Sequence, residues 1–331
     1  MSALRSALLV LVCLFLLPLQ AAAWERGHVD RFATLPEGAA NPEGIAVDRH
    51  GDVYVSGFNA TGAGTGKIFV FDAQGHLKRV LEVSGASSAL LGIAFHPDTQ
   101  ELLIVDIGQA RVHRVDRFTG DASVFSQAPA GAGLNALAFD RAGNVYVSDS
   151  FQGTIWRTGP AGGAPVAWAS DALLTTTGYP PFGANGLDFN AEESALFVAN
   201  TGNDTIVRIP VLAGVAGAPQ VFTHAINGAD GLFVDAEGNV WVCANQSDEI
   251  VVVDGTGKAI AKLGDFDGVR KGSPVGLLFP ASLVRHGDWI YITNLSLDLR
   301  PITGQQAVDS QWIGQVTTHT VSRIRARIPR L

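Results

Sequence analysis

A short phrase recurs six times along the chain, and it constrains the fold more than any other feature. It has the pattern X-[GA]-[IL]-x-[FV], and consecutive copies begin 48, 44, 50, 45 and 45 residues apart. A period near 45 residues is typical of β-propellers built from four-stranded blades. The sequence therefore predicts an all-β, six-bladed β-propeller with four antiparallel strands per blade. The first position of the phrase is occupied in turn by Glu43, Leu91, Asn135, Asn185, Asp230 and Val275.

The first hairpin of the repeat is also recognisable. Residues 48–55, 140–147 and 235–242 share an Asp, then a Gly-Asp or Gly-Asn turn, then alternating β-branched and aromatic residues. Such turns connect two antiparallel strands. The sixth repeat lacks a fourth strand before the chain ends at Leu331. We expect residues 28–35, which precede the first phrase, to supply that strand and close the ring, because closure removes open sheet edges.

The N-terminal segment has a different character. Arg5 is followed by the apolar run Ala7 to Leu17, and three alanines end at Ala23. This pattern predicts a cleaved secretory signal peptide over residues 1–23, because the run is shorter than the roughly 18–20 residues that span a bilayer. We therefore expect a single propeller domain over residues 24–331, secreted or periplasmic, with no membrane attachment after cleavage.

Cysteine content and charge restrict the remaining possibilities. Cys13 lies in the predicted signal peptide, so Cys243 has no disulfide partner in the mature chain and is expected to be a buried packing residue. The net charge of −8 argues against a nucleic-acid partner. A small-molecule substrate is the partner that we expect.

The first position of the phrase carries the chemistry. The first strand of a propeller blade faces the central channel, so one register forms one ring of side chains. Glu43, Asn135, Asn185 and Asp230 would supply oxygen atoms, which a hard cation such as Ca²⁺ requires. Capping of turns is the alternative for the Asn and Asp residues. Glu43 favours the metal, because burying a carboxylate near the axis without a cation is costly.

Long loops are expected on the face above this ring. They are residues 57–66, 170–184 and 295–317, and within them Tyr179 to Phe182 is a candidate apolar wall. A second register at the ends of the second strands lies on the same face. Its residues either contact the substrate or cap the loops that follow; they are Asp106, Asp149, Asn200, Asn245 and Asn294.

The opening phrases resemble a known family. The segments Asn41-Pro-Glu-Gly-Ile-Ala-Val-Asp48, Asn135-Ala-Leu-Ala-Phe-Asp140, Asn185-Gly-Leu-Asp-Phe189 and Asp230-Gly-Leu-Phe-Val-Asp235 are similar to the senescence-marker-protein/gluconolactonase/LRE-like family. The order Glu, Asn, Asn, Asp also resembles phosphofluoridate hydrolase and the paraoxonases. Where sugar-lactonase members have an arginine two residues before the ligand, this chain has Gly133.

The resemblance implies metal-dependent hydrolysis of a lactone or a related ester. Ca²⁺, or in some members Zn²⁺ or Mn²⁺, would be held by Glu43, Asn135, Asn185 and Asp230, with Asp230 as general base or nucleophile. The metal would polarise the substrate oxygen. Three alternatives stay open: a non-enzymatic NHL-like binding propeller, a phosphotriesterase and a strictosidine-synthase-like enzyme.

Overall fold

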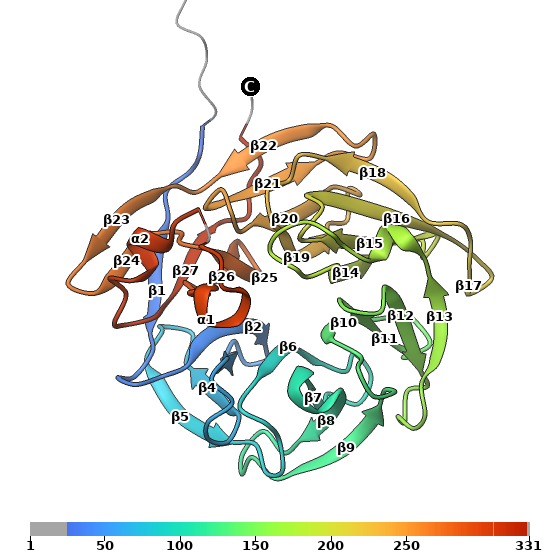
Figure 1. Ribbon diagram of the computed structural model, residues 1–331, viewed down its shortest axis with the longest axis horizontal. Coiled ribbons are helices and arrows are strands. Elements are labelled where there is room, and N and C mark those ends of the chain that lie inside the picture. The colour runs from blue at the N-terminus through green and yellow to red at the C-terminus, as the bar shows by residue number, and fades with distance from the viewer. Residues whose placement is uncertain (1–24, 307, 330–331) are drawn as a thin grey trace, which may run out of the picture.

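The computed structural model describes residues 25–306 and 308–329, and the predicted signal peptide lies outside the described residues. Six antiparallel sheets are arranged around a central axis as a six-bladed β-propeller (Figure 1). The innermost strands contact their neighbours in sequence around the ring, and the last contacts the first. The predicted fold class is confirmed. Among the described residues, no helix is long and apolar enough to cross a membrane.

Each blade begins at the axis and proceeds outward. The strands of blades 1 to 3 are β2 (Asn41–Val47), β3 (Val53–Phe58), β4 (Lys67–Phe71), β5 (Leu77–Glu82); β6 (Leu90–Phe95), β7 (Leu102–Asp106), β8 (Arg111–Val115), β9 (Ala122–Gln127); and β10 (Leu134–Phe139), β11 (Val145–Asp149), β12 (Thr154–Thr158), β13 (Val166–Ser170). The strands of blades 4 and 5 are β14 (Ala184–Phe189), β15 (Ala195–Asn200), β16 (Thr205–Leu212), β18 (Gln220–His224), with a short β17 (Val215–Ala216) beside β16; and β19 (Ala229–Val234), β20 (Val240–Ala244), β21 (Glu249–Val253), β22 (Ala259–Leu263).

Blade 6 closes the ring with a strand from the other end of the chain. It comprises β25 (Pro280–His286), β26 (Trp289–Asn294), β27 (Thr320–Arg325) and, outermost, β1 (Asp30–Thr34). The strand β1 runs antiparallel to β27 from Asp30 opposite Arg323 to Thr34 opposite Thr320. Its Phe32 ring packs edge-on against Tyr291, with 4.7 Å between the centroids. The predicted closure by residues 28–35 is therefore confirmed.

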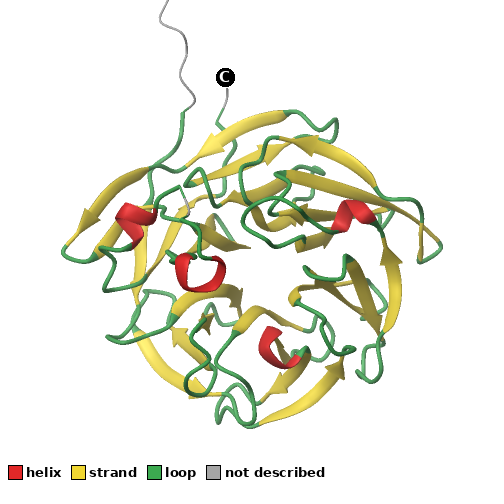
Figure 2. Cartoon of the chain, in the orientation of Figure 1, coloured by secondary structure: helices red, strands yellow, loops and turns green. Residues whose placement is uncertain are grey.

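Helical segments and one extra hairpin lie outside the blades (Figure 2). The helical segments are short, and all of them connect strands. They are η1 (Ile107–Gln109), η2 (Ala172–Leu174), α1 (Arg300–Thr303) and α2 (Ser310–Ile313). The extra hairpin pairs β23 (Phe266–Arg270) with β24 (Ser273–Gly276) between blades 5 and 6, and the repeat pattern did not predict it.

The core consists of apolar layers between adjacent blades. One cluster joins blades 1 and 2, and others join blades 3 and 4, 4 and 5, 5 and 6, and 6 and 1. The cluster between blades 2 and 3 continues over the axis into residues 278–299. In blades 1 and 3, for example, the second strand is buried along its whole length, whereas the outermost strand is largely exposed or half-buried. Cys243 is buried on β20, as expected for a packing residue.

The recurrent hairpin turns have a common cause. In blade 3, Asp140 Oδ1 accepts hydrogen bonds from the backbone N–H groups of Ala142 and Asn144, and Gly143 has a φ of 76°. Asp48 and Asp235 make the equivalent pairs of bonds in blades 1 and 5. An aspartate that bonds to the backbone two residues on stabilises a turn, and glycine adopts positive φ without steric cost.

Glycine in the opening phrase allows the innermost strands to approach one another. A Cβ added to Gly44 would lie 2.4 Å from the carbonyl oxygen of Leu91, and one added to Gly186 would lie 2.5 Å from that of Asp230. Gly92 and Gly231 meet the next blade in the same way. The glycine therefore sets how closely the blades converge beside the first position of the phrase.

Candidate metal and substrate site

The four predicted ligand residues lie together at the axis. Glu43 is on β2, Asn135 on β10, Asn185 on β14 and Asp230 on β19, and all four line one cavity. Each side chain is buried. We call these four residues the axial ring.

The ladders define the register of the ring. In blade 1, Ile45 pairs with Val55 on the second strand, and the ring residue Glu43 lies two positions before Ile45. The same rule gives Leu91 in blade 2, where Ile93 pairs with Ile104. The rule also holds for the other three ring residues, through the pairs Leu137 with Val147, Leu187 with Val198 and Leu232 with Val242.

In blade 6 the prediction of Val275 at this position is wrong. Leu283 pairs with Ile292, so the position belongs to Ala281, which is fully buried. Val275 lies in β24 of the extra hairpin. The next residue, Gly276, has a φ of 88°, whereas no opening-phrase glycine of the other blades has positive φ. The copy at 275–279 thus satisfies the phrase in composition, but its backbone follows another path.

The axial ring contains oxygen atoms without partners. Glu43 Oε2, Asn135 Oδ1 and Asp230 Oδ1 are buried and have no hydrogen-bond partner. Within the described part of the chain, every other buried side-chain atom that lacks a partner is a nitrogen. Buried polar atoms in native proteins are normally paired, and an exception requires an explanation such as an ion or a water. Three such oxygens on one cavity match what a hard cation binds.

Two hydroxyl groups hold the ring amides in a fixed orientation. Asn135 Nδ2 donates to Ser150 Oγ at 3.1 Å, and Ser150 Oγ donates to the carbonyl oxygen of Ala184 at 2.7 Å. Because a hydroxyl has one proton, a Ser150 that donates to Ala184 accepts from the amide nitrogen. The amide oxygen of Asn135 therefore points away from Ser150, where it remains unpaired.

Asn185 is held by the same arrangement one blade further on. Its Nδ2 donates to Thr201 Oγ1 at 3.0 Å, and Thr201 Oγ1 donates to the carbonyl oxygen of Ala229 at 2.7 Å. Ala184 and Ala229 immediately precede the next ring residues, Asn185 and Asp230. Each hydroxyl therefore links the ring residue of one blade to the backbone of the following ring residue.

Asp230 is held by an amide. Asn245 Nδ2 donates to Asp230 Oδ2 at 2.8 Å, which leaves Asp230 Oδ1 unpaired. Burial raises the pKa of Asp230 to about 7, against the opposing effect of the side-chain amides of Asn245 and Asn185. Burial and, secondly, the charge of Asp230 raise the pKa of Glu43 well above its usual range. A cation between the two carboxylates would favour their ionised forms.

The second predicted register divides into two kinds of residue. Four members cap loops: Asp149 Oδ1, for example, accepts from the backbone N–H groups of Gly133, Phe151 and Gln152. Asp106, Asn200 and Asn294 also bond to loop backbone. Asn245 belongs to another register, because Ala244 occupies the capping position in blade 5. Asn245 aligns with Ser150 and Thr201, the residues that hold the other ring amides.

Apolar side chains form the walls above the ring. The cavity has a volume of about 40 Å³. Two predicted wall residues, Pro180 and Phe182, line it, whereas Pro181 is exposed. The hydroxyl of Tyr179 donates to the carbonyl oxygen of Gln305 at 3.0 Å instead. The lining residues that the sequence did not suggest are Phe58, Phe279, Leu295, Leu297 and Leu299.

The segment from Leu295 to Gln305 covers one side of the mouth, and we call it the lid. It follows β26 directly and contains α1, which lies toward the centre of the ring in Figure 1. Leu295, Leu297 and Leu299 are buried in the cluster that joins blades 2 and 3 across the axis. Asn41 Nδ2 donates to the carbonyl oxygens of Leu295 and Ser296, which attaches the start of the lid to blade 1.

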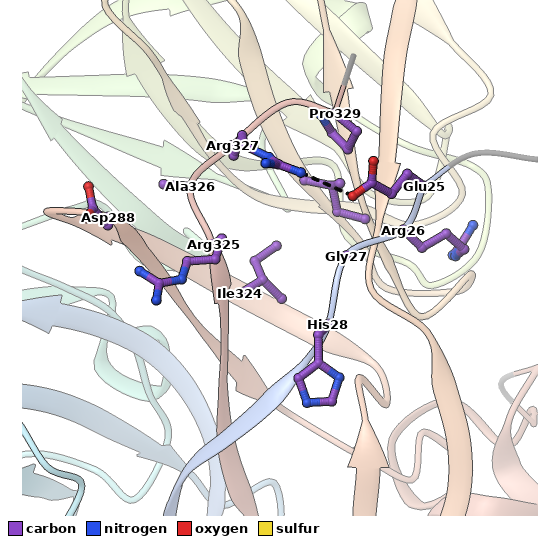
Figure 3. Close-up of a pocket in the computed structure, with 11 residues that line it drawn as sticks. Glu25, Arg26, Gly27, His28, Asp288, Ile324, Arg325, Ala326, Arg327 and Pro329 are labelled. Atoms are coloured by element: carbon purple, nitrogen blue, oxygen red, sulfur yellow. Dashed lines mark hydrogen bonds and ion pairs between the residues drawn. The ribbon is translucent and has the colours of Figure 1, made fainter. Parts of the chain in front are cut away.

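A wider cavity of about 470 Å³ lies at the rim, where the two ends of the described chain meet (Figure 3). Its cationic groups already have partners. Arg327 bonds to Glu25, Arg26 bonds to Glu249, and the Arg325 guanidinium stacks on Trp289. This cavity contains no residue of the axial ring.

Comparisons with known proteins agree with the fold. Residues 126–264, less than half of the chain, match the model of the SMP-30/gluconolactonase/LRE-like region. No curated protein sequence matches the chain. A gluconolactonase from Xanthomonas campestris is 16% identical, with 92% of each chain covered and a TM-score of 0.63. A calcium-binding regucalcin from Agrobacterium tumefaciens is 17% identical, covers 91% of this chain and 97% of its own, and has a TM-score of 0.62.

The predicted resemblance to this family is confirmed over residues 126–264, which include Asn135, Asn185 and Asp230. Another similar structure, a streptogramin B lyase, is 15% identical with a TM-score of 0.57 and 82% of each chain covered. Such identities establish the fold alone, and one fold hosts several reactions. The activity that this family match suggests is therefore taken up as a proposal below.

Proposed function

We propose that this protein is a metal-dependent hydrolase that acts on a lactone or a related ester at the axial ring. The observation that carries the proposal is the set of unpaired buried oxygens, Glu43 Oε2, Asn135 Oδ1 and Asp230 Oδ1. Burying such atoms without a partner costs about 1–3 kcal/mol each, and more for a charged group. A bound cation removes this cost.

The donor set favours Ca²⁺ over softer metals. The ring offers two carboxylates and two amides, and carboxylate and carbonyl oxygens suit Ca²⁺, Mg²⁺ and Mn²⁺. Among the described residues no group of three or more His, Cys, Asp or Glu side chains could hold a metal, so the two amides are essential to this site. Zn²⁺ and Mn²⁺ are the other ions to test.

Asp230 is the residue that we assign to proton transfer. A cation in the ring would polarise the substrate oxygen and stabilise the charge that develops on it. Asp230 Oδ2 is held by Asn245, so the carboxylate keeps its orientation while Oδ1 has no hydrogen-bond partner. The Asp230 carboxylate takes the proton of the attacking water, or it attacks the carbonyl carbon itself as the nucleophile. The apolar walls restrict water at this point.

The first experiment measures thermal unfolding of the purified protein in chelator and with added Ca²⁺. Binding to the folded state alone adds about 2.7 kcal/mol of stability at 100 times the dissociation constant. We expect this gain in the wild type and not in Asp230→Ala. The exposed Asp267 provides a matched control, and Asp267→Ala should keep the full gain.

A gain that is lost in Asp230→Ala would be followed by assays with lactones, carboxylic esters and phosphotriesters. Hydrolysis of the phosphotriester alone would place the protein with the phosphotriesterases. No gain with Ca²⁺, Zn²⁺ or Mn²⁺ in folded, metal-free protein would contradict the proposal, and it would favour the NHL-like binding propeller. Activity that does not depend on any metal would point to the strictosidine-synthase-like alternative.

We also propose that the protein is exported, on the basis of the pattern in residues 1–23. Mass spectrometry of the protein from the periplasm or medium of its host should give a chain that begins near Trp24. A cytoplasmic chain that retains Met1 would contradict the export.

A further inference from the structure

The cavity above the axial ring is divided into a polar half and an apolar half. The division is clearest at the ends of the second strands, three residues after the second-strand residue that defines the ring register in each blade. In blades 3, 4 and 5 this position is polar, and it is occupied by Ser150, Thr201 and Asn245. In blades 6, 1 and 2 it is apolar, and it is occupied by Leu295, Phe58 and Ile107.

The ring position itself follows the same division with one exception. Blades 3 to 5 contribute Asn135, Asn185 and Asp230, whereas blades 6 and 2 contribute Ala281 and Leu91. Glu43 of blade 1 is the only polar ring residue on the apolar side, among the described residues. Phe279 and the lid residues Leu297 and Leu299 extend the apolar surface upward.

Few polar groups of the lining remain for a substrate. Among the described residues no arginine, lysine or histidine lines the cavity, and its two carboxylates are the proposed metal ligands. Thr201 already donates its proton to Ala229, and Asn245 donates to Asp230. A polyhydroxylated sugar lactone would lose several hydrogen bonds to water here without replacing them, and each loss is costly.

We propose that the substrate is a lactone or ester with an apolar substituent, and this inference rests on the proposed function. The hydrocarbon part lies against Phe58, Leu91 and Leu295. The carbonyl group lies toward Asn135, Asn185 and Asp230. Water oxygen forms a bond to the carbonyl carbon, the acyl C–O bond breaks, and the leaving oxygen takes up a proton. The products are the hydroxy acid, or the acid and an alcohol.

The lid must move away from the axial ring before such a substrate can bind. The cavity volume of about 40 Å³ suits an ion with a little water, and ligand pockets are typically about 300–1,000 Å³. The hydrocarbon part therefore takes space that Leu297 and Leu299 now fill. These leucines then contact the substituent directly, so the lid determines specificity.

The test is a series of γ-lactones with straight alkyl substituents of increasing length, measured beside glucono-δ-lactone with the metal-loaded protein. Burial of a methylene contributes about 0.8 kcal/mol, so kcat/KM should rise about fourfold for each added methylene until the apolar half is filled. Glucono-δ-lactone should be hydrolysed more slowly than every long-chain lactone.

Two lid variants sharpen the result. Leu297→Asn and the milder Leu297→Ala should flatten the dependence on chain length, so that the ratio of kcat/KM between the long-chain lactones and unsubstituted γ-butyrolactone falls. Leu212 on β16 is 83% exposed, so Leu212→Asn is the control and should behave as the wild type. The wild-type series tests the proposal even where a lid variant does not fold.

The outcomes separate this inference from the proposed function. Faster hydrolysis of glucono-δ-lactone than of any alkyl lactone would overturn the apolar substrate class and leave the metal-dependent hydrolase in place. An equal rate along the alkyl series would do the same. Metal-loaded, folded protein that hydrolyses no lactone or ester would overturn both.

Discussion

Blades 3 to 5 and blades 6, 1 and 2 have the same architecture, yet their axial ends differ in chemistry. In the first group each ring residue is held by the polar side chain that follows the second strand of its own blade: Ser150, Thr201 or Asn245. In the second group the equivalent positions are apolar, and they pack into the cluster below the lid. A ring of six similar strands can therefore be polar and rigid on one side and apolar on the other.

The two halves should be indistinguishable in how tightly their inner strands pack. Gly186→Ala in the polar half and Gly44→Ala in the apolar half both place a Cβ within about 2.5 Å of a neighbouring carbonyl oxygen. We expect each to cost about 3 kcal/mol or more of unfolding free energy, because the backbone of the next blade must shift. Urea unfolding measures the loss.

Gly159 provides the control for these variants, since a Cβ there would meet no atom within 4 Å. Gly159→Ala should change the unfolding free energy by less than about 0.5 kcal/mol. Gly186→Ala displaces the backbone of Asp230 and should also reduce the stabilisation by Ca²⁺, whereas Gly44→Ala should reduce it less. Unequal costs of the two substitutions in the absence of metal would show that the halves already differ in packing.

Asp248 bonds to the backbone of the apolar half, and its contribution to the free energy of unfolding should depend on pH. Its Oδ1 accepts from the backbone N–H of Phe279 at 2.7 Å. Burial raises its pKa to about 8, and the charges of Asp309 and Glu249 act in the same direction. The ordinary value is 3.8, so between these values the folded state holds a proton that the unfolded state has released. The stabilisation is therefore present at low pH and is lost as the pH rises through about 8.

Asp248→Asn keeps an acceptor for Phe279 and removes the ionisation. We expect its unfolding free energy to fall less than that of the wild type between about pH 5 and pH 9. The difference in slope should not exceed about 1.4 kcal/mol per pH unit, the value for one proton. Denaturant titrations at several pH values measure it, with Asp267→Asn as an exposed control. Parallel profiles of wild type and Asp248→Asn would mean that Asp248 ionises freely in the folded protein.

The sequence predicted the repeat-based part of the molecule. The six blades, the closing strand at residues 28–35 and the convergence of the four ring residues all follow from one periodic register, because a propeller converts the period into a ring. The prediction from this register is wrong at Val275, which does not lie at the ring position of blade 6. The extra hairpin at residues 266–276 contains a copy of the phrase, and only the ladder between β25 and β26 identifies Ala281.

The periodic pattern did not predict the side chains that hold the ring residues, nor did it predict the lid. The reasons differ. Ser150 and Thr201 were visible in the sequence, but their role depends on hydrogen bonds to the backbone of the next blade. The sequence analysis grouped Asn245 with the residues at the ends of the second strands, although Ala244 occupies that position in blade 5. Its role likewise depends on a side-chain hydrogen bond, which it donates to Asp230. Leu297 and Leu299 lie between β26 and β27, in an insertion that is longer than the equivalent loop of any other blade, so no repeat indicates where their side chains lie.

Thr201→Val is the most direct test of the hydrogen bonds that hold the ring residues of the polar half. The substitution preserves the shape of the side chain but removes the hydroxyl that accepts from Asn185 and donates to the carbonyl of Ala229. Unpaired buried groups should then cost about 1–3 kcal/mol of unfolding free energy without metal. Asn185 also becomes free to rotate, and loss of such a support typically weakens metal binding by about 10- to 100-fold. Calcium titrations followed by calorimetry measure the second effect.

Thr154 is the matched control because it is equally a buried threonine with a hydroxyl partner, Ser170, but lies away from the axis. Thr154→Val should lower stability and leave the dissociation constant for Ca²⁺ unchanged. If both variants bind Ca²⁺ as the wild type does, the polar side chains that hold the ring residues contribute to packing alone. The difference between the two halves of the ring would then have no part in binding the metal. A weaker affinity in Thr201→Val only would show that the neighbouring blade holds Asn185 ready for the ion.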